Sequence, residues 1–175
     1  LMETAKTSAP PKVSVLIPTY NHERYIFQAV QSALQQETAF EVEIVIGEDC
    51  STDRTREILL EMQRNNLDRI RLLLHAQNVG GPANVAACFS ACRGDYVAML
   101  EGDDYWTDAT KLQKQIDALE SHPHWSMCFH LTRTVYEDGS HQAEICPPAW
   151  TKEESTIEDL FQGYFFNTCS LVFRN

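Results

Sequence analysis

The sequence predicts an α/β domain in three layers with a mostly parallel central sheet, and three observations support this. From Pro11 onward, short β-rich runs alternate with segments whose apolar residues recur at helical spacing. The run at residues 96–100 is almost continuously apolar, as in a strand covered on both faces. With 175 residues, of which 43% are hydrophobic, the chain suits one core rather than two. We therefore expect one domain over residues 12–175, after a flexible lead-in at residues 1–11.

The strands and helices are expected to alternate over the first 120 residues. Apolar, β-branched runs predict strands at residues 13–17, 42–46, 70–74 and 96–100. Apolar residues three and four apart predict helices over about residues 22–36, through residues 58–62, from about residue 82 to 92, and through residues 112–119. In the third helix, Val85, Phe89 and Cys92 would form the apolar face. After Pro123 the rhythm changes, and we expect strands at residues 126–130, 132–136 and 171–173, a tight turn at residues 138–139 and a short helix at residues 156–161.

Polar residues before the helices are candidates for N-caps, because their side chains can accept the free N–H groups of a first turn. The candidates, in chain order, are Asn21, one of Ser51, Thr52 or Asp53, and Thr107 or Asp108.

The formal net charge of −11 argues against nucleic acid or an anionic membrane surface as a partner, because both are bound through surplus Lys and Arg. A phosphate-bearing ligand would need local positive charge, from backbone amides at a helix start or from a divalent cation. No apolar run approaches the roughly 20 residues of a membrane span. The six cysteines form no C-x-x-C pair, which is typical of reduced thiols in a cytosolic protein. We expect a cytoplasmic location, with any attachment to the inner face of a membrane supplied by another part of the protein.

Polar or acidic residues follow four of the predicted strands. They are Pro18-Thr19-Tyr20-Asn21, Glu48-Asp49, Asn78-Val79-Gly80-Gly81 and Glu101-Gly102-Asp103-Asp104. In a doubly wound sheet, ligands bind at the carboxyl ends of the strands. The sequence therefore predicts that these groups meet at one edge of the sheet and form a site.

The segment at residues 101–104, hereafter the acidic turn, carries three carboxylates within four residues. Their repulsion is offset most simply by a hard cation such as Mg²⁺ or Mn²⁺, which would also bridge to a diphosphate. Gly102 would remove a side chain where a ligand comes close. A solvated turn with Asp104 at a helix start is the alternative interpretation.

The other two segments also have structural alternatives. Asp49 could accept hydrogen bonds from a base or a ribose, whereas Asn78 and Gly80 could simply belong to a turn that opens a helix. Neither a G-x-G-x-x-G nor a G-x-x-x-x-G-K-[ST] pattern is present, so the defining residues of NAD-binding and P-loop proteins are missing.

These strand ends, in this order, resemble family 2 glycosyltransferases with the Rossmann-like GT-A fold. Residues 13–21 (VSVLIPTYN) look like the family's opening strand, residues 48–53 (EDCSTD) like its D-D-x-S-x-D segment, and residues 94–104 (GDYVAMLEGDD) like the strand leading into its D-x-D motif. The resemblance runs from about Lys12 to Leu119 and continues faintly to Phe173.

The resemblance implies transfer of a sugar from a nucleotide donor, most often UDP-linked, to a hydroxyl of a glycan or glycoconjugate acceptor. It further implies inversion, dependence on Mg²⁺ or Mn²⁺, and a role in bacterial polysaccharide biosynthesis. The expected nucleotide-sugar-binding residues are Pro18, Thr19, Tyr20, Glu23, Glu48, Asp49, Asn78, Gly80, Glu101, Gly102 and Asp103. Asp103 and Asp104 are the expected metal ligands. Glu48 and Glu101 depart from the family's Asp residues.

An inverting displacement needs a carboxylate that takes the acceptor proton, and we match none here. We therefore expect the base beyond Asn175, and a chain that binds donor and metal yet turns over slowly or not at all. Two alternatives stay open. One is a non-catalytic nucleotide-sugar-binding domain. The other is a sugar-1-phosphate nucleotidyltransferase, which would want a Gly-rich basic loop after the first strand, unlike residues 18–21.

Overall fold

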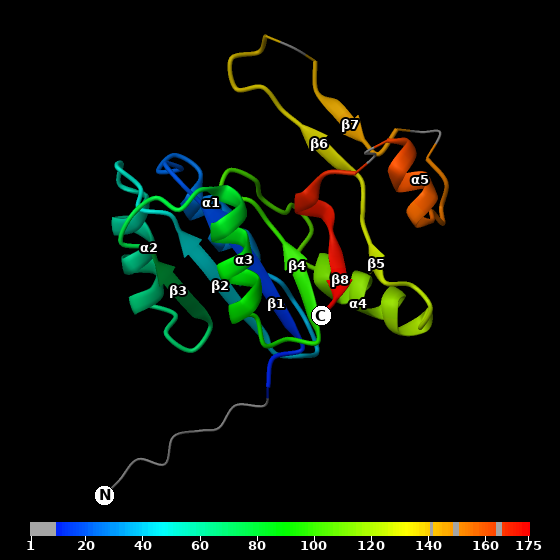
Figure 1. Ribbon diagram of the computed structural model, residues 1–175, viewed down its shortest axis with the longest axis horizontal. Helices are drawn as coiled ribbons and strands as arrows, with labels where there is room; N and C mark the ends of the chain where they lie inside the picture. The colour runs from blue at the N-terminus through cyan, green and yellow to red at the C-terminus, as the bar shows by residue number, and fades with distance from the viewer. Residues whose placement is uncertain (1–9, 141, 149–150, 164–165) are drawn as a thin grey trace, which may run out of the picture.

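A central sheet of six strands forms the middle layer of the computed structural model, which describes residues 10–140, 142–148, 151–163 and 166–175 (Figure 1). The spatial order is β3-β2-β1-β4-β8-β5. The strands are β1 (Val13–Thr19), β2 (Val42–Glu48), β3 (Ile70–Leu74), β4 (Tyr96–Met99), β5 (Met127–Cys128) and β8 (Val172–Arg174). The first four are parallel, β8 runs antiparallel to β4, and β5 runs antiparallel to β8. The predicted mostly parallel sheet is confirmed.

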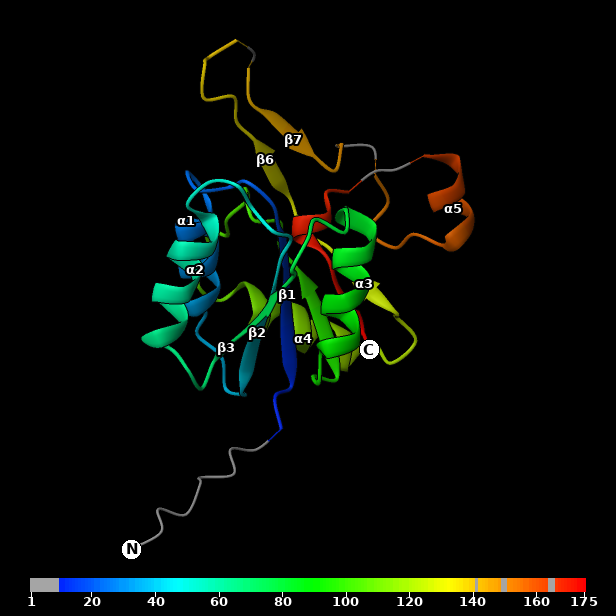
Figure 2. The ribbon, with the colours of Figure 1, turned by 60° about the vertical axis from the view of Figure 1, so that its left-hand side comes forward.

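Helices cover both faces of this sheet. They are α1 (Ile26–Leu34), α2 (Thr55–Arg64), α3 (Gly81–Ala91) and α4 (Lys111–Ser121). Apolar residues of α1, α2 and α4 share one core with the residues of β1 that face them, whereas α3 packs on the opposite face. Figure 2 shows α1 and α2 on one side of the sheet and α3 on the other. This is the expected three-layer α/β/α arrangement.

The burial of β1 and β2 explains their sequences. Val13, Val15 and Ile17 point into the core under α1, α2 and α4, and Leu16 points into the core under α3. Strands buried on both faces need apolar residues at successive positions rather than alternate ones. The apolar, β-branched runs that predicted these strands therefore reflect their place inside the sheet.

The first helix begins later than predicted, and Asn21 is not its N-cap. Helix α1 starts at Ile26, its N-cap residue is Tyr25, and Asn21 adopts a left-handed conformation with φ of 56°. The cause is a set of tertiary hydrogen bonds. The backbone N–H of His22 donates to Thr55 Oγ1 (2.8 Å) and that of Glu23 to Asp53 Oδ2 (3.0 Å). The segment before α1 is thus bound to the β2–α2 loop and to the start of α2, and it forms only an isolated turn, in which Tyr25 N and Ile26 N donate to His22 O (3.0 and 2.9 Å).

The other capping predictions are also wrong. The N-cap positions of α2 and α4 are Arg54 and Thr110, and neither makes a side-chain capping bond. Asp53 and Asp108 instead accept the backbone N–H two residues ahead, at 2.9 and 2.8 Å, which are local turn bonds that compete with helix capping.

The buried face of α3 differs from the predicted one. Asn84 and Cys88 are buried, whereas Phe89 is 41% exposed. A polar residue faces the sheet because Asn84 Nδ2 donates to the backbone oxygen of Gly47 (2.8 Å), and Asn84 Oδ1 lies 3.1 Å from His75 Nε2. The hydrogen bonds satisfy the buried amide, so apolar periodicity alone could not find this face.

A two-stranded hairpin rises above the edge of the sheet where the parallel strands end, hereafter the carboxyl edge (Figure 1). It pairs β6 (Thr132–Thr134) with β7 (Glu144–Cys146), which was not predicted. The expected strands at residues 126–130 and 132–136 are shorter in the structure. The turn at Gly139 is present, with φ of 66° and an N–H that donates to Tyr136 (3.0 Å).

The remaining elements follow the prediction closely. Helix α5 (Ile157–Gln162) begins with a capping box between Thr156 and Asp159, and the 3₁₀ turn η1 (Thr168–Ser170) leads into β8. Within the described residues, no helix is long and apolar enough to cross a membrane. Residues 1–9 of the expected lead-in lie outside the described residues.

Gly47 allows α3 to approach β2 closely, and this generates a prediction. A Cβ atom at this position would lie 2.1 Å from Asn84 Oδ1 and 2.3 Å from Cys88 Sγ. Gly47→Ala should lower the free energy of unfolding by about 1–3 kcal/mol, because the packed core must shift to accommodate a methyl group. Gly81→Ala is the matched control, since its Cβ would meet nothing within 4 Å. Denaturant titration giving equal losses for both variants would contradict this packing.

Lys111, at the start of α4, is an unusual buried cation. Its side chain lies over the Trp106 ring, with Nζ 3.7 Å from the ring centre, and Nζ has no hydrogen-bond partner among the described residues. Burial lowers the pKa of Lys111 from 10.5 to about 7, against a smaller opposing effect of the nearby Cys128 and Cys169 thiols. Ionised Lys111 therefore destabilises the folded state.

The pH dependence of stability should reveal this lysine. Between the folded pKa of about 7 and the ordinary value of 10.5, the unfolded chain binds more protons at this site than the folded chain. The contribution of this site to stability must then rise with pH, by up to about 1.4 kcal/mol per pH unit. Chemical denaturation at pH 7, 8 and 9 should give a more positive slope of stability against pH in the wild type and in the exposed-lysine control Lys114→Met than in Lys111→Met. The buried thiols, whose pKa values are raised in the folded state, lower this slope equally in all three proteins. An identical slope in all three proteins would disprove the assignment.

Candidate functional site

The ends of β1, β2 and β4 lie side by side at the carboxyl edge. Backbone hydrogen bonds continue past the strands: Asp49 N donates to Thr19 O (3.1 Å), and Gly102 N donates to Pro18 O (3.2 Å). The structure therefore brings these segments together at one edge, as predicted, and the β1–α1 loop lies in the middle.

Glu48 is a fully buried carboxylate that holds the loop after β2. Its Oε1 accepts the Ser51 N–H (2.6 Å), and its Oε2 pairs with Arg56 of α2. Arg56 also donates to the backbone oxygen of His75 (2.6 Å), so one ion pair ties the ends of β2 and β3 to α2. With 0% of its surface exposed, Glu48 positions this loop. The expected direct contact between Glu48 and a donor does not fit this geometry.

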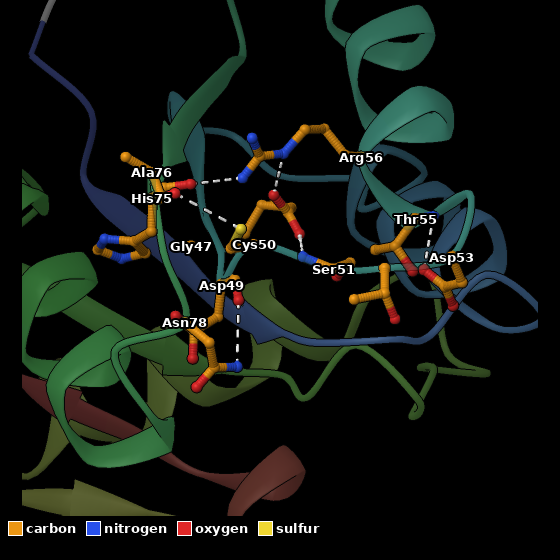
Figure 3. A network of polar contacts seen from close by, with 12 residues as sticks. Gly47, Asp49, Cys50, Ser51, Asp53, Thr55, Arg56, His75, Ala76 and Asn78 are labelled. Atoms are coloured by element: carbon orange, nitrogen blue, oxygen red, sulfur yellow. Dashed lines mark hydrogen bonds and ion pairs between the residues drawn. The ribbon is translucent and has the colours of Figure 1, made fainter.

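Asp49 joins the loop after β2 to the loop after β3. Its carboxylate accepts the backbone N–H groups of Val79 (2.7 Å) and Gly80 (2.9 Å), and its backbone oxygen accepts Asn78 Nδ2 (3.2 Å; Figure 3). Gly80, with φ of 86°, is the N-cap residue of α3. The structure thus brings Asp49, Asn78 and Gly80 together as predicted. Asp49 is only 2% exposed, and its two carboxylate bonds hold the start of α3. We call this pair of bonds the Asp49 clamp.

The loop after β1 is bound to the loop after β2 by polar side chains from both. Asn21 Oδ1 accepts Thr52 N–H (2.8 Å), and Glu23 Oε2 accepts Arg54 N–H (2.9 Å). The second bond engages one carboxylate oxygen of Glu23, an expected binding residue. Tyr20, by contrast, is 42% exposed at the edge of the site.

Glu101 of the acidic turn is half-buried and has two differently placed carboxylate oxygens. Oε1 accepts a hydrogen bond from the Thr168 hydroxyl, whereas Oε2 is buried and has no partner among the described residues. Burial raises the pKa of Glu101, the Thr168 hydrogen bond lowers it, and the charges of Asp104 and Asp103 raise it further. An unpartnered, buried carboxylate oxygen is costly unless a donor or cation reaches it.

Asp104 lies next to Glu101 and Cys169, and one ligand atom of each falls within 4.8 Å of the others. Burial raises the pKa of Asp104, and the charge of Asp103 raises it further, against a hydrogen bond from Cys169. Asp103 points outward, with a side chain 52% exposed and Oδ2 at 3.9 Å from His22 Nε2. The structure therefore groups Asp104 with Glu101, and Asp103 with His22.

Gly102 is needed for a different reason from the one predicted. A Cβ atom there would lie 2.5 Å from Thr19 Oγ1 and 2.7 Å from His22 Nδ1. The close neighbours are thus side chains of the β1–α1 loop. The expectation that Gly102 makes room for a ligand is corrected by this contact.

Sequence reasoning missed Arg56, His22, Thr168 and Cys169. Thr168 and Cys169 reach the acidic turn because β8 inserts beside β4, antiparallel to it. Nothing in their local sequence indicates that contact. The basic residue in the first turn of α2 and the buried acid at the end of β2 could have suggested the Glu48–Arg56 pair.

Comparison with known proteins identifies the family. Residues 14–174 match the sequence profile described as glycosyl transferase family 2. The chain belongs to glycosyl transferase family 2. An uncharacterised protein of Mycobacterium tuberculosis is 40% identical to this family 2 chain over 162 residues, which are 93% of this chain and 46% of that protein. The chain thus spans about half the length of this relative.

Solved structures show the same fold. Residues 1–349 of TarS from S. aureus match 93% of this family 2 chain and 47% of that chain, with a TM-score of 0.71 and 27% identity. The same TarS fragment in complex with UDP-GlcNAc matches 75% of this chain and 37% of its own, with a TM-score of 0.63 and 31% identity. A mannosyltransferase from Pyrobaculum calidifontis, solved with GDP-Man and Mn²⁺, has the same fold at 20% identity and a TM-score of 0.60, over 71% of this chain and 38% of its own.

Loss of one carboxylate oxygen at Asp49 should loosen the loop before α3. Asp49→Asn offers an NH₂ group to one of the two backbone N–H donors at Val79 and Gly80. It should therefore lower the free energy of unfolding by about 1–3 kcal/mol. The exposed Asp68→Asn is the control and should change little. Equal denaturation midpoints for both variants would show that the clamp contributes nothing.

Proposed function

We propose that this chain is the donor-binding part of an enzyme that transfers a sugar from a UDP-sugar to a hydroxyl group of a glycan or glycoconjugate acceptor in bacterial polysaccharide biosynthesis. The observation that carries the proposal is the buried Oε2 of Glu101, which has no hydrogen-bond partner in the described part of the chain and lies beside Asp104, at the same edge of the sheet as Asp49. Family membership supports a glycosyltransferase over the nucleotidyltransferase alternative.

The choice of UDP rests on the similarity to TarS, whose complex contains UDP-GlcNAc and which is 31% identical over the matched region. In the proposed arrangement, Pro18, Thr19 and Tyr20 line the nucleoside pocket, with the base near the Asp49 clamp. Glu101 accepts a hydrogen bond from a ribose hydroxyl through Oε2. Asn78, Gly80 and Gly102 shape the surrounding loops, and Glu23 and Glu48 hold them from behind.

The acidic turn suits a divalent cation of the Mg²⁺ or Mn²⁺ type. Its donors are carboxylate oxygens, which such hard ions prefer. The raised pKa values of Glu101 and Asp104 mean that their ionised forms are unfavourable without added positive charge. Asp103 and Asp104 are the proposed ligands, because Asp104 already lies in the cluster and exposed Asp103 is free to turn toward it. The cation would neutralise the charge of the departing diphosphate.

The proposed reaction inverts the sugar and needs a base near the acceptor hydroxyl. Asp159 of α5 is engaged with Lys152 (2.5 Å) and with the Thr156 N–H (2.9 Å), so it serves the helix start. We assign no base to this chain. A non-catalytic donor-binding role is the second possibility, and hydrolysis of UDP-sugar by a longer form of the protein would exclude it.

Calorimetric titration tests the site. Wild-type protein should bind UDP and a UDP-sugar more tightly with Mn²⁺ than without it, and UDP more tightly than GDP. Asp103→Ala should weaken metal-dependent binding at least about 10-fold, because loss of a ligand should exceed the typical effect of a supporting group. Asp104→Ala should do the same.

The control is Asp68→Ala, which removes an exposed carboxylate elsewhere on the surface. It should bind as the wild type does, apart from small long-range charge effects that salt removes. If the affinity for nucleotide changes neither with the metal nor with the Asp103 and Asp104 substitutions, the proposed site is refuted.

A further inference from the structure

We propose that Thr168 is a positioning residue for Glu101, and that it sets which oxygen of Glu101 faces the donor. The inference rests on the proposed function, since it concerns the same site. It concerns a residue far from the acidic turn in sequence, on the 3₁₀ turn η1 that precedes β8.

The hydrogen bond between these residues divides the carboxylate into two unlike oxygens. The Thr168 hydroxyl donates to Oε1 of Glu101, and Oε2 is left buried without a partner among the described residues. A hydroxyl has one hydrogen to donate, and it is used here. Thr168 therefore engages one carboxylate oxygen and leaves the other for an incoming hydroxyl donor.

The need for such a residue follows from the side chain at position 101. Glutamate has one more rotatable bond than aspartate, so holding its carboxylate in one orientation costs more conformational entropy. A hydrogen bond from a rigid partner sets the orientation before the ligand arrives. Ligand binding then no longer includes the entropy cost of orienting the carboxylate.

The turn η1 is held rigidly enough to serve as that partner. Trp106 Nε1 donates to Cys169 O (2.8 Å) and Gln115 Nε2 donates to Ser170 O (3.0 Å). On the hairpin side, Asn167 Nδ2 donates to Thr132 Oγ1 (2.8 Å). Contacts from the β4–α4 loop, from α4 and from the hairpin thus hold the residues that precede and follow Thr168 in the sequence.

Two substitutions of Thr168 separate the effect of its hydroxyl from the effect of its size. Thr168→Val keeps the shape of the side chain but cannot donate, whereas Thr168→Ser keeps the hydroxyl. In calorimetric titration of UDP with Mn²⁺, Thr168→Val should bind about 10-fold more weakly than the wild type. Thr168→Ser should stay within about 3-fold of it, because a hydrogen bond to a charged group accounts for most of the effect.

A double-mutant cycle tests whether Thr168 acts through Glu101. In a Glu101→Ala background, Thr168→Val should weaken UDP binding less than about 2-fold, since the group it positions is gone. Thermal unfolding of every variant checks that the comparison is between folded proteins. Thr168→Ala, which removes the hydroxyl with less bulk, replaces Thr168→Val if the latter does not fold.

The outcomes separate the two proposals. If wild-type protein binds no nucleotide, the proposed function fails and the inference fails with it. If the wild type binds but Thr168→Val binds equally well, only the inference is overturned. The same holds if Thr168→Ser is as weak as Thr168→Val, or if the loss persists in the Glu101→Ala background.

Discussion

A buried carboxylate must be matched by donors, and this constraint organises the whole carboxyl edge of the sheet. Glu48 is matched by the Ser51 N–H and by Arg56, and Asp49 by two N–H groups at the start of α3. These bonds fix the loops after β2 and β3. The loop after β1 is fixed in turn, because its residues bind the loop after β2. The acidic turn differs, since Glu101 retains an oxygen that no described residue satisfies.

This contrast separates carboxylates that hold the fold from those that can serve a ligand. Both kinds lie at the end of a strand or just after it, and both appear in the sequence as one or more acids beside small or polar residues. Exposure distinguishes them only partly, because Glu101 is itself half-buried. Their partners distinguish them clearly. Glu48 and Asp49 face backbone N–H groups and an arginine, whereas Asp104 faces another carboxylate and a thiol.

The sequence was sufficient for the parallel strands, the layers and the edge at which the polar residues meet, because each follows from local apolar patterns and from the order of the elements. It was insufficient where a distant contact decides. The start of α1 moved to Ile26 because His22 and Glu23 bind another loop, and the face of α3 turned toward Asn84 because Gly47 offers a carbonyl at close range. Thr168 lay beyond sequence reasoning for the same reason, since only the antiparallel insertion of β8 brings it to Glu101.

The charge of the protein makes the acidic turn harder to explain as a purely structural feature. With a net charge of −11, the surrounding field already disfavours further ionised acids. Burial and mutual repulsion add to this at Glu101 and Asp104, and raise the pKa of both. A structural turn could avoid the cost with amides or hydroxyls in place of the acids. Added positive charge at this turn would remove the cost and give the carboxylates a use, which is why we propose an anionic donor and a divalent cation together at this site.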